Sequence, residues 1–460
     1  MTPCGAIPEL AGLCRYDDAT RIGFSVDENV RRLVRLHWFE KRLMDIAAAR
    51  LPATPEWEVK CALALHQWQD GEHADAIRRR VSEMRSPPPP LDRAPDSVLD
   101  AFLEELLRAA GTTELVAGLA LAHSALVVAY RDHLERSNPL VDQPTRRVLR
   151  FNLIEEEEAS AWCERALDAL IVSDASARER ARTWQDHLRA YIDAAGGITG
   201  DVVTEAAALP PRRATQPFVP DTTPRRDDRF TGVHQFDFPP QTVYNAPGVS
   251  AEERNLALLC RRALEMDVPE TMASFMTERR DQPWDFYREY ARQLWDETRH
   301  AMMGTVALAA HGIDWTRLPL HVGFSLRLNL HAEPLERQIL LYAIEQSLMP
   351  GETGKRFEYE TAVAAGDELS AHFHDYDWAD EVLHAQIGRR WMKAEGLSVS
   401  DAVQRGAGIH ERTWTALDQH AVQRDADPWQ WWRDLVREAL GRESEAAPVA
   451  GPPPIVGQSG

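Results

Sequence analysis

The sequence predicts an all-α protein, and three observations support this fold class. Apolar residues recur with the 3.6-residue period of an amphipathic helix over long segments, whereas the alternation typical of strands is scarce. The segments SVDE at 25–28 and SAEE at 250–253 have the Ser-x-x-Glu pattern of a capping box at a helix start. Clusters of Pro and Gly separate the periodic segments, as PPPP does at 87–90.

The first periodic block follows the capping box at Ser25 and ends at Gly196-Gly197. Its breaks are a Pro-containing turn before Trp57, the four prolines at 87–90 and Asn138-Pro139, since Pro removes a backbone donor and ends helices. Between these breaks we expect helices over residues 26–50, 55–85, 97–136, 143–173 and 175–195.

The second block begins at Ser250, after a segment rich in Pro, Gly and charge that is predicted to be a linker lying over the surface. Its helices are expected over residues 251–279, 284–310, 333–365 and 367–395, with a kink or break at Pro350-Gly351, and two further helices follow. The last residues have a disordered composition. The predicted domains and segments are therefore 1–195, 196–248 (linker), 249–400, 401–445 and 446–460 (tail).

Composition and charge disfavour several classes of protein. The 460 residues are 44% hydrophobic, which is ordinary for a globular protein of two or three domains. A net charge of −20 makes nucleic acid a disfavoured partner, because a phosphate-binding surface needs concentrated Lys and Arg. The strongest local basic patch lies in the linker, where a solvated segment is the preferred interpretation: Arg212, Arg213, Arg225, Arg226 and Arg229.

The sequence also favours a cytoplasmic location. No apolar run reaches the length needed to cross a bilayer, and the N-terminus lacks the basic and apolar regions of a signal peptide. The five cysteines are scattered and odd in number, with no Cys-x-x-Cys pair. They favour a reducing compartment and disfavour a disulfide framework or a thiolate zinc site.

One nine-residue pattern occurs twice. Residues 296–304 read DETRHAMMG and residues 380–388 read DEVLHAQIG, so both follow D-E-x-x-H-A-x-x-G. In a helix, residues three apart share a face. Glu297 therefore points with His300, and Glu381 points with His384. A carboxylate and an imidazole on one face form half of a site for a first-row metal, and two matching copies are hard to assign to chance.

A two-metal centre in a four-helix bundle needs one more Glu from each of two further helices. If the helices before and after a turn near residue 281 are antiparallel, the position opposite Glu297 is Glu265. The same construction around residue 366 is less clear because of the Pro-Gly break, and it leaves Glu345 and Glu352 as alternatives.

These residues resemble the ligand set of the ferritin-like di-iron carboxylate superfamily: Glu265, Glu297, His300, Glu345, Glu381 and His384. The resemblance covers about residues 250–395 and extends to ferritin-like proteins of unknown function at Glu270, Gly366-Asp367 and Trp391. The intervals between ligands favour Glu345 over Glu352. The resemblance implies a ferritin-like bundle that holds two iron ions, or one manganese and one iron. It also implies that Asp296 and Asp380 accept hydrogen bonds from metal-bound histidines, and that Arg299 lies near Asp296.

The glycines of the pattern, Gly304 and Gly388, follow each His by one helical turn. Gly in a helix interior costs about 1 kcal/mol relative to Ala. Two such glycines at matching positions indicate a need for space, either for close helix packing or for substrate and O₂.

The first block repeats the theme incompletely. Glu40 precedes DGEHA, in which Asp70 and His73 lie three residues apart. A later helix carries Glu157, but Ser160 stands where a second His would be. We therefore predict a degenerate ferritin-like bundle, kept for packing or for shaping a substrate site. The alternative is a weak or mononuclear metal site at Glu40, Asp70 and His73.

The function expected from the resemblance is that of a non-haem di-iron or Mn/Fe enzyme. Such an enzyme uses O₂ to oxidise a small-molecule substrate, takes electrons from an external donor and can be a homo-oligomer. The main alternative is iron handling without an organic substrate, that is ferroxidase activity, sequestration or peroxide scavenging. Nucleic-acid hydroxylation and an interaction module with a relic site are weaker alternatives, the first because of the charge and the second because all six ligands are present.

Overall fold

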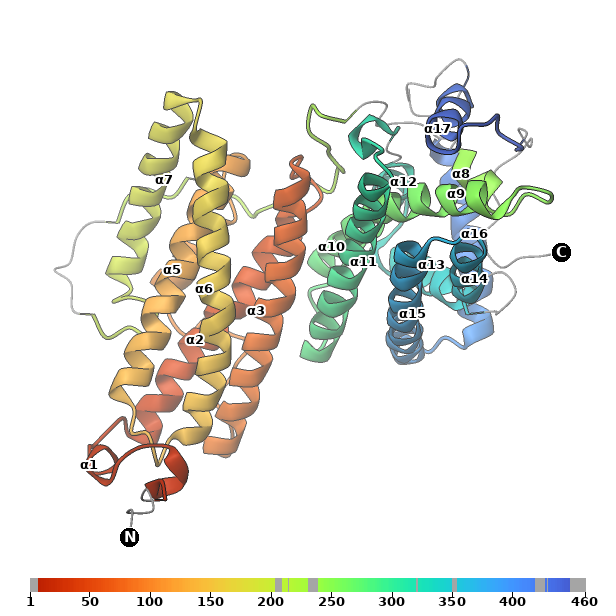
Figure 1. Cartoon of the computed structure of the whole chain (residues 1–460). Coiled ribbons are helices and arrows are strands. Elements are labelled where there is room, and N and C mark those ends of the chain that lie inside the picture. Colours follow the sequence, from red (N-terminus) through yellow and green to blue (C-terminus); the bar gives the residue numbers. More distant parts are fainter. Residues whose placement is uncertain are drawn as a thin grey trace, which may run out of the picture. The chain divides into compact units, whose positions relative to one another are not determined.

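The structure, a computed structural model, describes residues 7–202, 209–213, 215–230, 239–319, 322–349, 354–417, 427 and 429–446. Throughout these residues the regular secondary structure is helical, which confirms the all-α class (Figure 1). The chain divides into two compact units. Unit 1 comprises Met1–Ala47 and His66–Val219, and unit 2 comprises Ala48–Leu65 and Pro220–Gly460. The predicted linker boundaries, 195 and 248, lie on either side of residue 219.

Unit 1 contains long helices that run beside one another in Figure 1. They are α2 (Val26–Arg50), α3 (Trp57–Met84), α5 (Thr112–Arg136) and α6 (Gln143–Ile171), with α2 and α3 continuing into the segment that belongs to unit 2. Two further helices, α4 (Ser97–Leu106) and α7 (Ala175–Ala194), pack against α5, while η1 (Glu9–Gly12) and α1 (Tyr16–Ala19) precede α2.

The predicted helix over 97–136 is wrong as a single element. Asp96 caps α4 by accepting hydrogen bonds from the backbone amides of Val98 and Leu99, at 2.9 and 2.8 Å. The chain then turns, and α5 begins after Gly111, whose backbone is extended. The apolar periodicity continues across this turn, so periodicity alone did not reveal it.

Four helical segments form the larger part of unit 2. The first is α9 (Ala251–Ala263), the short 3₁₀ turn η2 (Leu264–Met266) and α10 (Asp267–Glu278); the second is α11 (Trp284–Ala310). The third is α13 (Pro334–Ser347) and α14 (Lys355–Ala364), and the fourth is α15 (Glu368–Ala394). The α11 helix packs against all three elements of the first segment and against α15. The α15 helix in turn packs against α13 and α14. The other elements of unit 2 are α8 (Pro239–Val243), η3 (Trp315–Arg317), α12 (Gly323–His331), α16 (Val399–Leu417) and α17 (Gln430–Leu440).

Helix starts and breaks in unit 2 follow local sequence signals in most places. Ser250 accepts a hydrogen bond from the amide of Glu253 at 3.4 Å, and Asp367 accepts one from the amide of Ser370 at 3.0 Å. Residues 350–353, which include the predicted Pro-Gly break, lie outside the described residues, and α13 and α14 end and begin on either side of them. The predicted helix over 251–279 is interrupted by η2, which carries Glu265.

Part of the predicted linker is packed into unit 2. Arg226 is buried and pairs with Glu270, which also pairs with Lys60 of α3. Trp57 lies against Phe230, with ring centroids 5.8 Å apart. These contacts explain why Ala48–Leu65 groups with unit 2. All five arginines of the proposed basic patch contact carboxylates, so none of them is an unpaired cation: Arg212, Arg213, Arg225, Arg226 and Arg229.

One helix among the described residues, α5, is long and apolar enough to cross a membrane by length and composition, contrary to the expectation from the sequence. Of its most apolar window, 61% is buried inside the protein. This burial is typical of a core helix, since core helices pass the same test.

Candidate metal centre

The two copies of the repeated pattern lie on α11 and α15, which pack against each other. Within each copy, Glu and His are one helical turn apart and share a face. The four side chains are at most 3% exposed: Glu297, His300, Glu381 and His384. The structure thus places both predicted half-sites in the interior of unit 2.

The first group of potential ligands contains residues from three helices. Glu297 of α11, Glu345 of α13, and Glu381 and His384 of α15 each offer an atom within 4.8 Å of the others. The Nδ1 atom of His384 lies 3.1 Å from a carboxylate oxygen of Glu297 and 3.3 Å from one of Glu381. The structure brings Glu345 into this group, whereas its alternative, Glu352, lies outside the described residues.

The second group, Glu265, His300 and Asp377, lies beside the first. The Nδ1 atom of His300 is 3.7 Å from Glu265 Oε2, 3.2 Å from Asp377 Oδ1 and 3.6 Å from Glu297 Oε2. The two oxygens of Glu297 therefore face the two imidazoles, whose ring centroids are 5.8 Å apart. The six predicted ligands come together as two adjacent groups linked by Glu297.

The two aspartates of the pattern pair crosswise. Asp380 of α15 accepts a hydrogen bond from Nε2 of His300 on α11 at 3.2 Å, and Asp296 of α11 accepts one from Nε2 of His384 on α15 at 3.5 Å. Arg299 donates to both aspartates. With Nε2 engaged by a carboxylate, each imidazole directs Nδ1 toward the Glu side chains. This is the orientation that acidic partners give to metal-binding histidines.

The pKa values of the histidines reflect this acidic surrounding. Burial opposes a charge on His300, but Asp377, Asp380 and Glu297 more than offset it and raise the pKa of His300 to about 10. The pKa of His384 is likewise raised well above its usual range, against burial, by Asp296, Glu297 and Glu381. The surrounding carboxylates thus favour the charged form of both imidazoles.

The carboxylates differ from one another. Burial favours the neutral form of Glu297, yet His300 and His384 lower its pKa to about 2. Against the same effect of burial, Lys355 is the main cause of the low pKa of Glu381. Burial and repulsion from Glu381 and Glu297 raise the pKa of Glu345 well above its usual range.

Two buried cations near the second group have no counterpart in the sequence analysis. Arg262 of α9 pairs with Glu265 and Asp377, each at 2.7 Å, and with Glu358 at 2.6 Å. Lys355 of α14 lies 3.0 Å from Asp377 and 2.9 Å from Glu381. The carboxylates of the second group are therefore shared with protein cations.

The sequence contains a signal for Asp377 but none for Lys355 and Glu358. Asp377 lies four residues before Glu381 on α15, so helical spacing alone places it one turn along the same face. Lys355 and Glu358 belong to α14, a separate helix, and no periodic pattern links them to the repeated motifs.

Six buried ligand atoms in these groups make no hydrogen bond of good geometry, although some of them lie within ion-pair distance of a neighbour. They come from every member of the first group and from two members of the second: Glu297 Oε1, Glu345 Oε2, Glu381 Oε2, His384 Nδ1, His300 Nδ1 and Asp377 Oδ2. A buried polar atom without a partner is unfavourable by about 1–3 kcal/mol. One cation in each group would satisfy these atoms, so the donor set fits bound metal ions.

The two glycines of the pattern allow close packing. A methyl group at Gly304 would overlap the backbone of Arg262 and Ala263 on α9, and one at Gly388 would overlap the ring of Tyr342 on α13. The need for space predicted from the sequence is thus met by helix contact at both positions.

The other predicted side chains lie elsewhere. Glu270 pairs with Lys60 and Arg226 and belongs to neither ligand group. In unit 1, Glu40, Asp70 and His73 do converge, and the α6 residue that joins them is Glu156, whereas the sequence analysis considered Glu157.

Comparisons with known proteins give no relative. No family model matches the chain, and neither the curated proteins nor the solved structures contain a match.

Proposed function

We propose that unit 2 is a ferritin-like bundle that holds two iron ions, or one manganese and one iron, and uses O₂ to oxidise a small molecule. One ion would be held by Glu297, Glu345, Glu381 and His384, and the other by Glu265, His300 and Asp377. The observation that carries this proposal is the convergence of buried carboxylate and imidazole atoms without hydrogen-bond partners. Carboxylate oxygens combined with imidazole nitrogens suit iron and manganese.

The arrangement of the ligands supports the same proposal. In the di-metal carboxylate plan, two helices each supply Glu-x-x-His and two others each supply Glu. Here α11 and α15 carry the Glu-x-x-His pairs, while η2 and α13 carry Glu265 and Glu345. Asp377 is an addition to that plan, as are the cations Arg262 and Lys355.

The chemistry divides between the metals and the chain. Bound metal ions in the reduced state would supply the electrons that O₂ takes up, and an external donor would be needed to reduce them again. The chain orients the imidazoles through Asp296 and Asp380, and Arg299 holds these two acids together. Burial of the four Glu and His residues of the repeated pattern keeps bulk water away from them, whereas 23% of the Glu265 side chain is exposed.

The two groups should differ in affinity. In the second group, Glu265 and Asp377 already contact Arg262, and Asp377 also contacts Lys355. A metal ion there competes with these cations for two of its three ligands, whereas in the first group the contact with a lysine or arginine is that of Glu381 with Lys355. We expect the first group to fill first and the second to bind more weakly.

The test is metal content after anaerobic reconstitution with Fe(II). The wild-type chain should bind about two ions, while Glu297→Ala should lose both and Glu381→Ala should lose at least the ion of the first group. Glu368→Ala, an exposed position at the start of α15, is the matched control. A wild-type chain that binds no iron would overturn the proposal.

Oxygen uptake then separates an oxidase from an iron-handling protein. Consumption of O₂ in proportion to the two bound ions, without further uptake of iron, supports substrate oxidation. Accumulation of many irons per chain would instead indicate ferroxidase or storage activity.

A further inference from the structure

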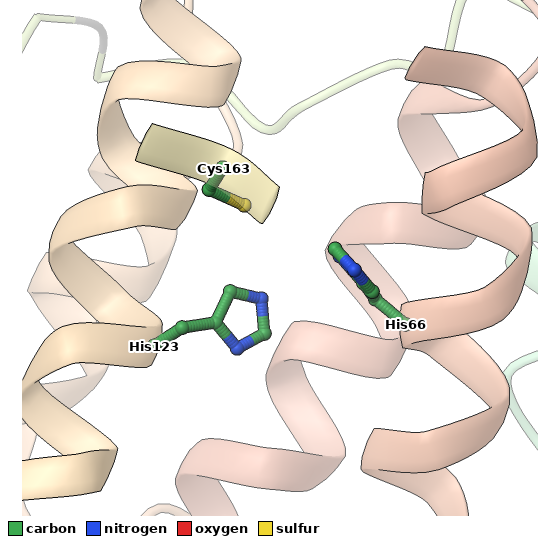
Figure 2. Close-up of side chains that lie close together, drawn as sticks. All are labelled: His66, His123 and Cys163. Atoms are coloured by element: carbon green, nitrogen blue, oxygen red, sulfur yellow. The ribbon is translucent and has the colours of Figure 1, made fainter. Parts of the chain in front are cut away.

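Unit 1 buries a second group of potential ligands, and it includes a cysteine. His66 of α3, His123 of α5 and Cys163 of α6 each offer an atom within 4.8 Å of the others (Figure 2). They are 4%, 1% and 0% exposed. Three helices thus direct two imidazoles and a thiol toward one point in the interior of unit 1.

The orientation of His123 is that of a metal ligand. Its Nδ1 atom donates a hydrogen bond to Oε2 of Glu156 at 2.9 Å, which leaves the lone pair on Nε2. The Nε2 atom is buried and has no hydrogen-bond partner. Figure 2 shows the ring of His123 turned toward His66 and Cys163, and the two imidazole centroids are 5.2 Å apart.

Glu156 is itself fixed by the acidic group of unit 1. Its other oxygen lies 3.2 Å from Nδ1 of His73, whose Nε2 contacts Glu155 at 2.8 Å. On the other side of the group, the hydroxyl of Tyr130 donates to Glu40. Glu156, which orients His123, is therefore held on its other side by His73.

We propose that His66, His123 and Cys163 bind a divalent ion of the zinc class. Thiolate and imidazole together favour such borderline-soft ions over the hard cations that carboxylates prefer. Three protein ligands leave one tetrahedral position for water or a small anion. This site lies wholly within unit 1 and is independent of the function proposed for unit 2. The sequence analysis disfavoured a thiolate zinc site because the chain has no Cys-x-x-Cys pair. The ligands of the proposed site come instead from three separate helices.

The test uses Co(II) as the probe, added to the metal-free full-length chain. Thiolate ligation gives an intense near-ultraviolet charge-transfer band, and the three groups of potential ligands among the described residues of unit 2 contain no cysteine. We expect the amplitude of this band to correspond to about one thiolate-bound Co(II) per chain, in addition to any Co(II) that the carboxylate groups of unit 2 bind. It should disappear in Cys163→Ser and weaken in His66→Gln, and it should persist in Cys260→Ser, a buried cysteine of unit 2.

A variant in which the other four cysteines are replaced by Ser tests the ligand without altering Cys163. A charge-transfer band that persists in this variant supports the proposal even if Cys163→Ser fails to fold. No band in the wild-type chain would overturn the proposal. A band that survives Cys163→Ser would do the same, as would Co(II) binding to unit 1 that depends on Glu40 and not on Cys163.

Discussion

Asp380 of α15 accepts a hydrogen bond from Nε2 of His300 on α11, at 3.2 Å. The reciprocal pair, Asp296 of α11 and His384 of α15, is 3.5 Å apart. Each copy of the repeated pattern therefore orients the imidazole of the other copy. This exchange gives a physical reason for the repeat, since the aspartate of each copy contacts Nε2 of the histidine in the other copy.

The crossed pairs predict an effect on metal affinity. Replacing Asp296 or Asp380 by Asn removes the negative charge that makes the paired imidazole a stronger ligand. Loss of such a partner lowers metal affinity by about 10–100-fold. Anaerobic Fe(II) titration measures this change, and Asp375→Asn, an exposed position on α15, is the control. Unchanged affinity in both variants would show that the aspartates serve only their arginine pairs.

Gly304 and Gly388 have different neighbours, so we expect their replacement by Ala to affect stability to different extents. Gly304→Ala places a methyl group against the backbone of α9, which cannot move without shifting the helix. We expect a loss of about 1–3 kcal/mol in the free energy of unfolding, as for other overpacked sites. Gly388→Ala meets the ring of Tyr342, which can rotate, so its loss should be smaller. Urea denaturation measures both.

Gly408 provides the matched control for these substitutions. It lies within α16, and a methyl group there meets no atom within 4 Å. Because Ala is favoured over Gly in helices by about 1 kcal/mol, Gly408→Ala should stabilise the protein. If Gly304→Ala stabilised it equally, the close approach of α11 and α9 would be contradicted.

Lys355 predicts a link between stability and metal. Its ammonium is buried between Asp377 and Glu381, so Lys355→Met leaves these carboxylates without that cation. Removal of one partner from a buried ion pair typically destabilises a protein by about 3–5 kcal/mol. A bound divalent ion would replace the lost charge. The metal-free variant should therefore melt well below the wild type, and Fe(II) should raise its Tm more than that of the wild type.

The exposed Lys393 on α15 gives the control, since Lys393→Met should change neither Tm nor its response to metal. Equal increases in Tm for Lys355→Met and the wild type would show that Lys355 and the metal do not share the same carboxylates.

The sequence predicted those parts of the molecule that depend on local signals. Helical periodicity located α11 and α15 closely, and the shared face of Glu297 and His300 follows from spacing along one helix. The crossed pairing of Asp296 with His384 could be expected only from the family resemblance, because it depends on how two helices face each other.

Long-range packing sets the remaining features. Lys355 and Glu381 lie on different helices, and the pairing of Lys60 with Glu270 joins positions 210 residues apart. The grouping of residues 48–65 with unit 2 has the same origin. Neither apolar periodicity nor turn signals carry information about such pairs, since both describe neighbours along the chain.

His37 predicts a dependence of stability on pH. Burial, together with Arg78 and Lys41, lowers its pKa to about 3, below the value of 6.5 expected in the unfolded chain. As the pH falls below 6.5 the unfolded state binds a proton that the folded state does not, so stability is complete above this pH and declines toward pH 3. The slope from one such group is at most about 1.4 kcal/mol per pH unit.

Urea denaturation between about pH 7.5 and 5 should show a weaker decline in stability for His37→Leu than for the wild type. The exposed His372→Leu should keep the wild-type slope, and an identical decline in all three proteins would contradict a neutral buried His37.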